Sequence, residues 1–145
     1  NKKLHKKIKR IKTYKLTQLF KKYFYPDLIR MDVEGHEIEI FKNLINKKLK
    51  KYPMICFETH FSKYQKNKKM ENNLKSLFQI GYKVKMASSS SQTGSNLVNE
   101  LGYGPTIKSI ETDDVKRNIY QNIRNNDAIN LICKTGGLRT VLLSK

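Results

Sequence analysis

Apolar and polar residues alternate along the chain with two periods, one typical of strands and the other of helices. A near-continuous apolar run over residues 28–33 predicts a strand that is covered on both faces. Residues 36–49 place their apolar side chains on one helical face, and a second apolar strand follows over 54–57. A helix at 70–78 and a strand at 82–86 continue the pattern. This order predicts an α/β fold with a mainly parallel sheet.

The segments outside this central pattern give weaker signals. Residues 87–105 contain a serine run and several glycines, which predicts a long loop that is either a mobile lid or disordered. The other expectations concern short elements near the two ends of the chain: a strand around 8–11, a helical turn at 16–20, a helix marked by Val115, Ile119 and Ile123, a strand at 128–133, and a short edge strand or none at 138–145.

Candidate chemistry lies where the first two core strands end. Asp32 and Glu34 follow the first of these strands, and Glu58 and His60 follow the second. A right-handed crossover brings the carboxyl ends of neighbouring parallel strands to one edge, so we expect Asp32 and Glu58 to lie close together. Glu58 and His60 are two residues apart, and an extended strand end would project both to one side. That geometry suits a general base held by a carboxylate.

The same residues also fit roles that are purely structural. These alternatives are Asp32 as a helix cap, Glu34 as a complement to the helix dipole, and Glu58 with His60 as a surface pair near Lys63. We expect Glu37 to be solvated or ion-paired and His36 to lie at the surface, while His5 sits in a basic tail. Asp32, Glu58 and His60 are suitable ligand types for a metal, but no spacing signature supports a site, so no metal is predicted.

The formal net charge of +18 invites a polyanion-binding interpretation. The excess comes from lysine, however, and the chain has only five arginines, the residue that bidentate contacts to bases and phosphates favour. Alanine occurs only as Ala87 and Ala128, a bias typical of an AT-rich genome. We therefore favour a solvated lysine shell, and a basic surface for nucleic acid stays the alternative.

Two cysteines and the absence of long apolar runs indicate the compartment. Cys56 and Cys133 each lie in a strand-like apolar run without a spacing suited to zinc. Such residues are typical of core positions in a reducing compartment, so we expect a cytoplasmic protein without a disulfide. The sequence contains no apolar run long enough for a membrane span and no visible signal peptide.

The turn after the first core strand resembles the FkbM-type family of S-adenosylmethionine-dependent methyltransferases. The family pattern Ile-Lys-x-Asp-Val-Glu-Gly-x-Glu is similar to residues 29–37, with Arg30 in place of the usual lysine. Three later segments of the chain match the family in order: Pro53 to Glu58, Gly81 to Val84, and Asn130 to Cys133. The ordered match spans about residues 26 to 133.

The resemblance implies the C-terminal half of a Rossmann-like methyltransferase sheet, mainly parallel with an antiparallel last strand. It implies S-adenosylmethionine as the cofactor and O-methylation of a small molecule or a sugar. The candidate catalytic residues are then Asp32, Glu34, Glu58 and His60. Two features depart from the family. Residues 16–18 lack the acid that precedes the motif strand. The first half of the family fold, whose glycine-rich turn and acidic residue would hold most of the cofactor, is also absent, and Gly102 to Pro105 is no substitute because no strand is expected before it.

The expected organisation is a basic N-terminal segment (1–13), a partial FkbM-like methyltransferase domain (14–135) and a C-terminal tail (136–145). The first residue is not methionine and the opening is highly charged, so we expect a piece of a longer protein. We also expect the chain alone to be inactive and to self-associate through an exposed sheet edge. The competing hypotheses are a non-catalytic basic domain that binds a polyanion, whose binding would weaken steeply with salt, and a degenerate half-domain that serves another subunit.

Overall fold

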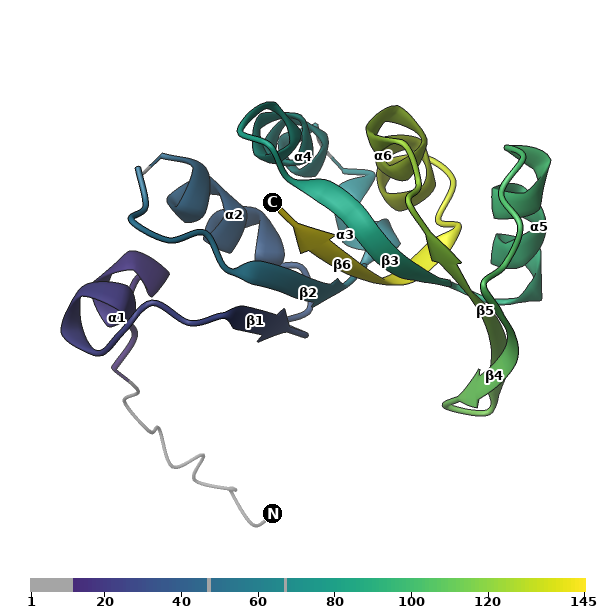
Figure 1. Cartoon of the computed structure of the whole chain (residues 1–145), viewed down its shortest axis with the longest axis horizontal. Helices are drawn as coiled ribbons and strands as arrows, with labels where there is room; N and C mark the ends of the chain where they lie inside the picture. The colour runs from purple at the N-terminus through teal and green to yellow at the C-terminus, as the bar shows by residue number, and fades with distance from the viewer. Residues whose placement is uncertain (1–11, 47, 67) are drawn as a thin grey trace, which may run out of the picture.

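One mixed sheet with helices packed along it forms the body of the molecule in the computed structural model, which describes residues 12–46, 48–66 and 68–145 (Figure 1). The strands are β1 (Leu28–Met31), β2 (Met54–Glu58), β3 (Lys83–Ser89), β4 (Ile107–Thr112), β5 (Val115–Gln121) and β6 (Leu138–Ser144). The helices are α1 (Leu16–Lys22), α2 (Glu37–Ile45), α3 (Phe61–Tyr64), α4 (Lys69–Gln79), α5 (Gln92–Glu100) and α6 (Asn125–Cys133). The strand expected around residues 8–11 lies outside the described residues.

The strand order across the sheet is β1-β2-β6-β3-β5-β4. β1 and β2 are parallel, and each of the other neighbouring pairs is antiparallel. The α/β class is therefore confirmed, but the prediction of a mainly parallel sheet is wrong. The reason is the path of the second half of the chain: β6 runs antiparallel between β2 and β3, and β4 with β5 forms an antiparallel hairpin. The chain does end in an antiparallel strand, but this strand is β6 and not residues 130–133, which the resemblance gave as the last strand and which are helical.

Residues 87–105 are not a long loop, because β3 continues to Ser89 and α5 occupies much of the rest. The serines are ordered by hydrogen bonds that sequence patterns do not reveal. Ser88 Oγ accepts the backbone N–H of Thr140 (3.1 Å), and the hydroxyls of Ser89 and Ser95 are 2.8 Å apart. Ser91 caps α5 by accepting the backbone N–H of Gly94 (3.2 Å).

Two further predictions are wrong in the type of element: a predicted helix is a strand, and a predicted strand is part of a helix. The predicted helix at 115–123 is strand β5, because residues four apart share a face of a strand as well as of a helix. Asp113 and Asp114 both have positive φ (52° and 57°) and form the tight turn that pairs β5 with β4. The predicted strand at 128–133 is part of helix α6, since a short apolar run fits any buried element.

The segment 138–145 is the largest correction to the fold. It was expected to add a short edge strand or none, but β6 lies in the middle of the sheet, hydrogen-bonded to β2 on one side and β3 on the other. Leu138, Val141 and Leu143 are almost fully buried there. Because β6 joins the two halves of the sheet, its residues belong to the core.

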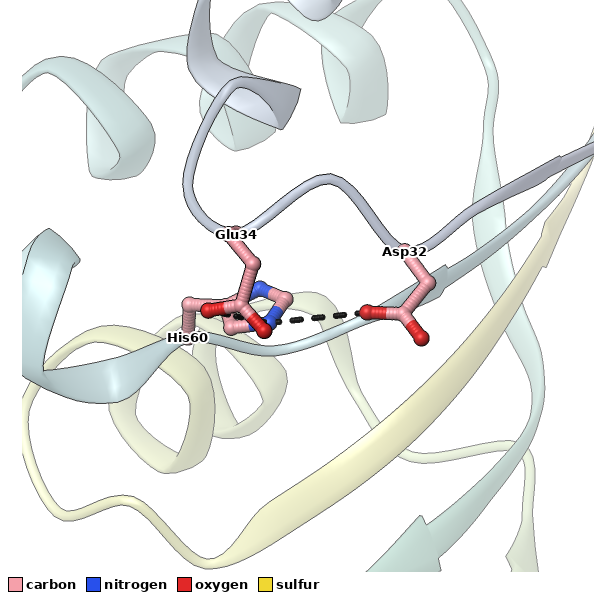
Figure 2. A group of neighbouring side chains, drawn as sticks. All are labelled: Asp32, Glu34 and His60. Atoms are coloured by element: carbon pink, nitrogen blue, oxygen red, sulfur yellow. Dashed lines mark ion pairs between the residues drawn. The ribbon is translucent and has the colours of Figure 1, made fainter. Parts of the chain in front are cut away.

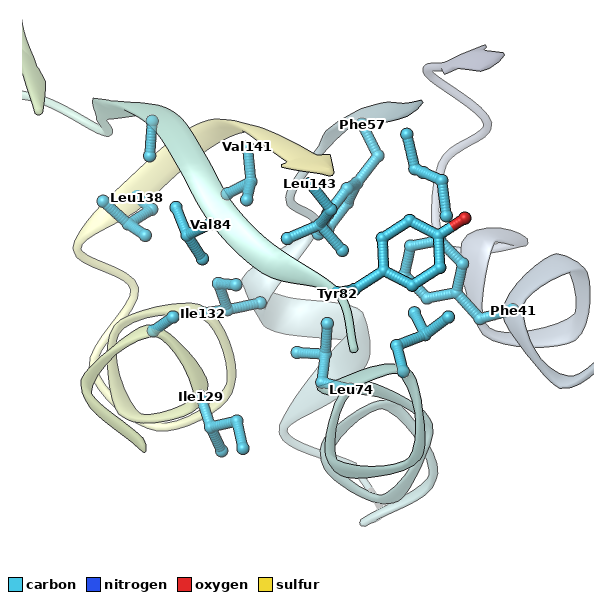
Figure 3. Packing of buried hydrophobic residues seen from close by; sticks show 14 of the residues in the cluster. Phe41, Phe57, Leu74, Tyr82, Val84, Ile129, Ile132, Leu138, Val141 and Leu143 are labelled. Carbon is cyan, nitrogen blue, oxygen red and sulfur yellow. The ribbon is translucent and has the colours of Figure 1, made fainter. Parts of the chain in front are cut away.

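The core lies between the sheet and the helices α2, α4 and α6, which line one face of it (Figures 1 and 3). The rings of Phe41 in α2 and Phe57 in β2 meet edge to face, with centroids 5.1 Å apart. Both side chains are inaccessible to solvent, and burial of each contributes about 1.5–3 kcal/mol. The Tyr82 hydroxyl donates to the carbonyl of Pro53 (2.7 Å), which fixes the chain just before β2.

Both cysteines carry free thiols. Cys133 is buried at the end of α6, and burial raises the pKa of its thiol to about 12. Cys56 is half-buried in β2, and burial raises its pKa as well. A raised pKa keeps a thiol protonated and unreactive near neutral pH, so both residues behave as packing groups. Among the described residues, no helix has the length and apolar character needed to cross a membrane.

Candidate functional site

The candidate site lies where β1 and β2 end. The two strands are parallel neighbours with Met31 opposite Phe57, so the residues that follow them leave the sheet at the same edge. Asp32 follows β1 directly, and His60 follows β2 at the start of α3. The prediction that Asp32 and Glu58 share one edge is therefore confirmed. Ligands bind at such strand ends in open α/β sheets.

The turn between β1 and α2 has an unusual backbone. Glu34 and Gly35 both have positive φ, at 53° and 100°. A left-handed conformation at a residue other than glycine costs about 1 kcal/mol or more and is common at functional sites. The turn is held by the backbone N–H of His36, which donates to the carbonyl of Val33 (3.1 Å). As a result, Glu34 turns its carboxylate back toward the end of β2.

Asp32, Glu34 and His60 converge in front of this turn (Figure 2). His60 Nε2 lies 3.7 Å from Asp32 Oδ1 and 3.6 Å from Glu34 Oε2. The imidazole is only 9% exposed, whereas the side chains of Asp32 and Glu34 are 42% and 80% exposed. The group therefore combines a fixed, buried ring with two carboxylates that are open to solvent.

Glu37 is the residue that sequence reasoning missed. The expectation of a solvated side chain is wrong, because Glu37 is completely buried at the start of α2, whereas the alternative of an ion-paired residue agrees with its contact to His60. Its Oε1 lies 3.2 Å from His60 Nδ1 and accepts the backbone N–H of Val33 (3.1 Å). The hydroxyl of Tyr64 donates to Glu37 Oε2 (3.4 Å), and burial raises the pKa of that tyrosine. Glu37 thus lies behind the ring of His60, in contact with Nδ1 but without a hydrogen bond to it.

Glu58 faces a different partner from the one expected. Its carboxylate pairs with Arg139 (2.6 Å) and more weakly with Arg30 (3.9 Å), whereas the charged contacts of His60 go to the residues around β1. The expectation of a Glu58–His60 pair is therefore wrong. Glu58 and His60 do not face each other because the extended backbone ends at Glu58, so the alternation of side chains along β2 does not continue to His60.

His36 lies beside the site but not in it. The residue is exposed at the start of α2, as expected for a surface histidine. It lines a groove of about 710 Å³ between α1 and α2, together with Val33 and Tyr14. No contact of His36 with the carboxylates at the end of β1 is present among the described residues.

Replacing Gly35 by alanine is expected to lower the free energy of unfolding by about 1–2 kcal/mol. An alanine at a φ of 100° is strained, and its Cβ would approach Cγ of Lys63 to 3.0 Å. Chemical denaturation measures the effect. Gly104→Ala is the matched control, because a Cβ there meets no atom within 4 Å. Equal stability of the two variants would contradict the left-handed turn.

Comparison with known protein families adds one finding to this geometry. Residues 4–84 match the methyltransferase FkbM domain, which is more than half of the chain. The matched range includes β1, the turn with Asp32 and Glu34, β2 and His60. Comparisons with curated proteins and with solved structures give no match.

Proposed function

Because this chain belongs to the FkbM methyltransferase family, we propose that it transfers a methyl group from S-adenosylmethionine to a hydroxyl group of a small molecule or a sugar. The observation that carries the proposal is the convergence of Asp32, Glu34 and His60 at the shared end of β1 and β2. This convergence lies within the residues that match the family.

The chemistry requires an aligned acceptor and, for a hydroxyl, the removal of a proton. The donor, when bound, supplies a methyl group on a positively charged sulfur. Asp32 is the proton acceptor in this proposal, because its carboxylate is partly exposed at the end of a strand. Glu34 adds negative charge beside it, and His60 positions the Asp32 carboxylate from the buried side. Glu58 contributes a third carboxylate at the same edge, with its charge balanced by Arg139.

The described residues fit the acceptor side of such a cleft and do not fit the adenosyl side. None of the described strands leads into a glycine-rich turn, and the space at Gly35 is closed by the side chain of Lys63. β1 is at the edge of the sheet, and no strand of the described residues pairs with its outer side. In this proposal the described residues form the acceptor side of the active site, and residues outside them form the pocket for the adenosyl group.

The experiment that tests the reaction uses the natural protein together with labelled S-adenosylmethionine. A panel of sugars and small hydroxylated compounds is offered, and mass spectrometry locates the transferred methyl group. Methyl groups on oxygen are expected. Methylation of nitrogen or carbon alone would contradict the proposed acceptor class.

The proposed location of the protein is the cytoplasm, which agrees with its two free thiols.

The chain of 145 residues is expected to bind S-adenosylmethionine poorly on its own and to self-associate. Calorimetry should show no saturation below about 1 mM, the upper end of common substrate affinities. Light scattering should show oligomers, and Leu28→Lys should reduce them, because Leu28 is 48% exposed on the edge strand. Tight binding of the cofactor to a monomer would overturn the half-site proposal.

A further inference from the structure

The three groups at the end of β1 and β2 have the composition of a metal site. His60 Nε2, Asp32 Oδ1 and Glu34 Oε2 offer one nitrogen and two oxygen ligands that lie within 4.8 Å of one another. Ligands held by one ion at about 2.1 Å stand roughly 3–4 Å apart. The separations of 3.6 and 3.7 Å from Nε2 fall in this range and are too long for hydrogen bonds. We propose that these residues bind a divalent first-row transition-metal ion.

The buried imidazole is the observation that distinguishes this group from an ordinary acidic cluster. The His60 side chain is more than nine-tenths buried, and Nδ1 is a buried atom without a hydrogen bond. Nε2 points toward the two carboxylates, as Figure 2 shows. A ring fixed in this way presents its nitrogen to a position that Asp32 and Glu34 also face. An N–H on Nε2 would be too far from either carboxylate oxygen to form a hydrogen bond, at 3.7 and 3.6 Å, so a cation between the three groups would complete the arrangement.

Glu37 supplies the support that metal-binding histidines commonly have. Its Oε1 lies 3.2 Å from Nδ1, on the side of the ring opposite the proposed ion. A carboxylate behind a ligating histidine commonly fixes the orientation of the ring, and here Glu37 lies at contact distance from Nδ1 without a hydrogen bond to it. With Glu37 counted, three carboxylates surround one imidazole. A protonated ring supplies a single positive charge against them, and a divalent ion balances the site better.

The charges around the site favour a cation. The chain carries 30 lysine and arginine residues, yet among the described residues the ion pairs of Asp32 and Glu34 lead only to His60. The nearby arginines, Arg30 and Arg139, pair with Glu58 instead. Lys63 packs against Gly35, but no ion pair joins a lysine or arginine of the described residues to Asp32 or Glu34, so their charge remains available to a metal ion.

Imidazole and carboxylate ligands together suit Mn²⁺, Fe²⁺, Co²⁺ or Zn²⁺. Three protein ligands with an exposed side are typical of catalytic metal sites, which keep a position open for substrate. A bound ion there would polarise the hydroxyl oxygen of the acceptor. With the ion bound, the metal would make the acceptor hydroxyl more acidic, and the released proton would pass to the Asp32 carboxylate oxygen that does not ligate the ion. This role rests on the proposed methyl transfer, whereas binding of the ion does not.

The test measures metal binding directly. The chain is freed of metal with a chelator and titrated with Co²⁺, whose visible absorption reports ligand binding, and with Mn²⁺ by electron paramagnetic resonance. One ion per chain is expected. Asp32→Asn and Glu34→Gln should each weaken binding at least about tenfold. Both side chains are partly or largely exposed, so these variants should keep the fold.

Matched controls separate the site from general charge effects. Glu39→Gln and His36→Asn change exposed residues of the same helix and turn, and both should leave binding unchanged. His60→Asn should weaken binding of Co²⁺ more than that of Mg²⁺, because magnesium prefers oxygen ligands. Absence of saturable binding, or binding that Asp32→Asn and Glu34→Gln do not alter, would overturn the proposal.

The two proposals fail in different ways. Metal binding without methyl transfer would refute the proposed reaction and leave the site standing. Methyl transfer that survives complete removal of metal, together with no measurable Co²⁺ or Mn²⁺ binding, would refute the metal site alone. A bound ion that accelerates methyl transfer supports both.

Discussion

Replacing Asp32 by asparagine is expected to lower methyl transfer by the natural protein about 10²- to 10⁴-fold, the usual contribution of a general base. The change removes the charge and proton affinity of the carboxylate while preserving its shape. Asp32 is 42% exposed and lies beyond the last residue of β1, so the fold should persist. The measurement is the initial rate of methyl transfer, with circular dichroism to confirm folding.

Asp27→Asn is the control for this prediction. Asp27 precedes the same strand, is exposed, and pairs with Lys51 at the surface. Its loss should change the rate by less than about twofold, because exposed ion pairs contribute little. A fully active Asp32→Asn variant would contradict the role of Asp32 as the base, whereas its role as a metal ligand is decided by the binding measurements.

Val141→Asp is expected to lower the free energy of unfolding by at least about 4 kcal/mol, enough to unfold much of the protein. Val141 is inaccessible to solvent and lies in β6 between Phe57 of β2 and Ala87 of β3. A carboxylate at that position is buried without a partner, and the strand that joins the two halves of the sheet is lost. Circular dichroism and chemical denaturation measure the change.

Ile107→Asp is the matched control for the central strand. Ile107 is also β-branched, but it is 49% exposed in the edge strand β4. The same substitution there should cost about 1 kcal/mol or less. Similar losses at the two positions would contradict the central place of β6. Retention of the fold by a chain lacking residues 138–145 would contradict it as well.

The site was more predictable than the second half of the fold, for a physical reason. A strand, a helix and a second strand leave few topologies, and the crossover rule alone places Asp32 and Glu58 at one edge. The family resemblance is confirmed by the match over residues 4–84. In the second half, the residues at 115, 119 and 123 satisfy both strand and helix periods. Only the turn at Asp113 and Asp114, which pairs β5 with β4, distinguishes the strand from the helix.

Glu37 shows what a closer look at one helix could have found. It occupies the same face of α2 as Phe41 and Leu44, four and seven residues later, and all three are buried. A charged residue on the apolar face of a helix requires a buried partner. The pattern thus indicated a buried contact for Glu37, although the sequence alone could not identify His60 as that contact. The pairing of Glu58 with Arg139 could not be predicted, because the sequence patterns did not identify β6 as the strand next to β2.

The unequal pairing of β1 and β2 divides the site into a compliant side and a rigid side. β1 has four residues and one neighbouring strand in the part of the chain that the structure describes, whereas β2 is hydrogen-bonded along both edges. Local opening therefore costs less free energy at Asp32 and Glu34 than at His60. Any element that pairs with the outer edge of β1 would stiffen the compliant side. Pairing of a further element with the outer edge of β1 is thus thermodynamically linked to the distances between the two carboxylates and the imidazole of His60.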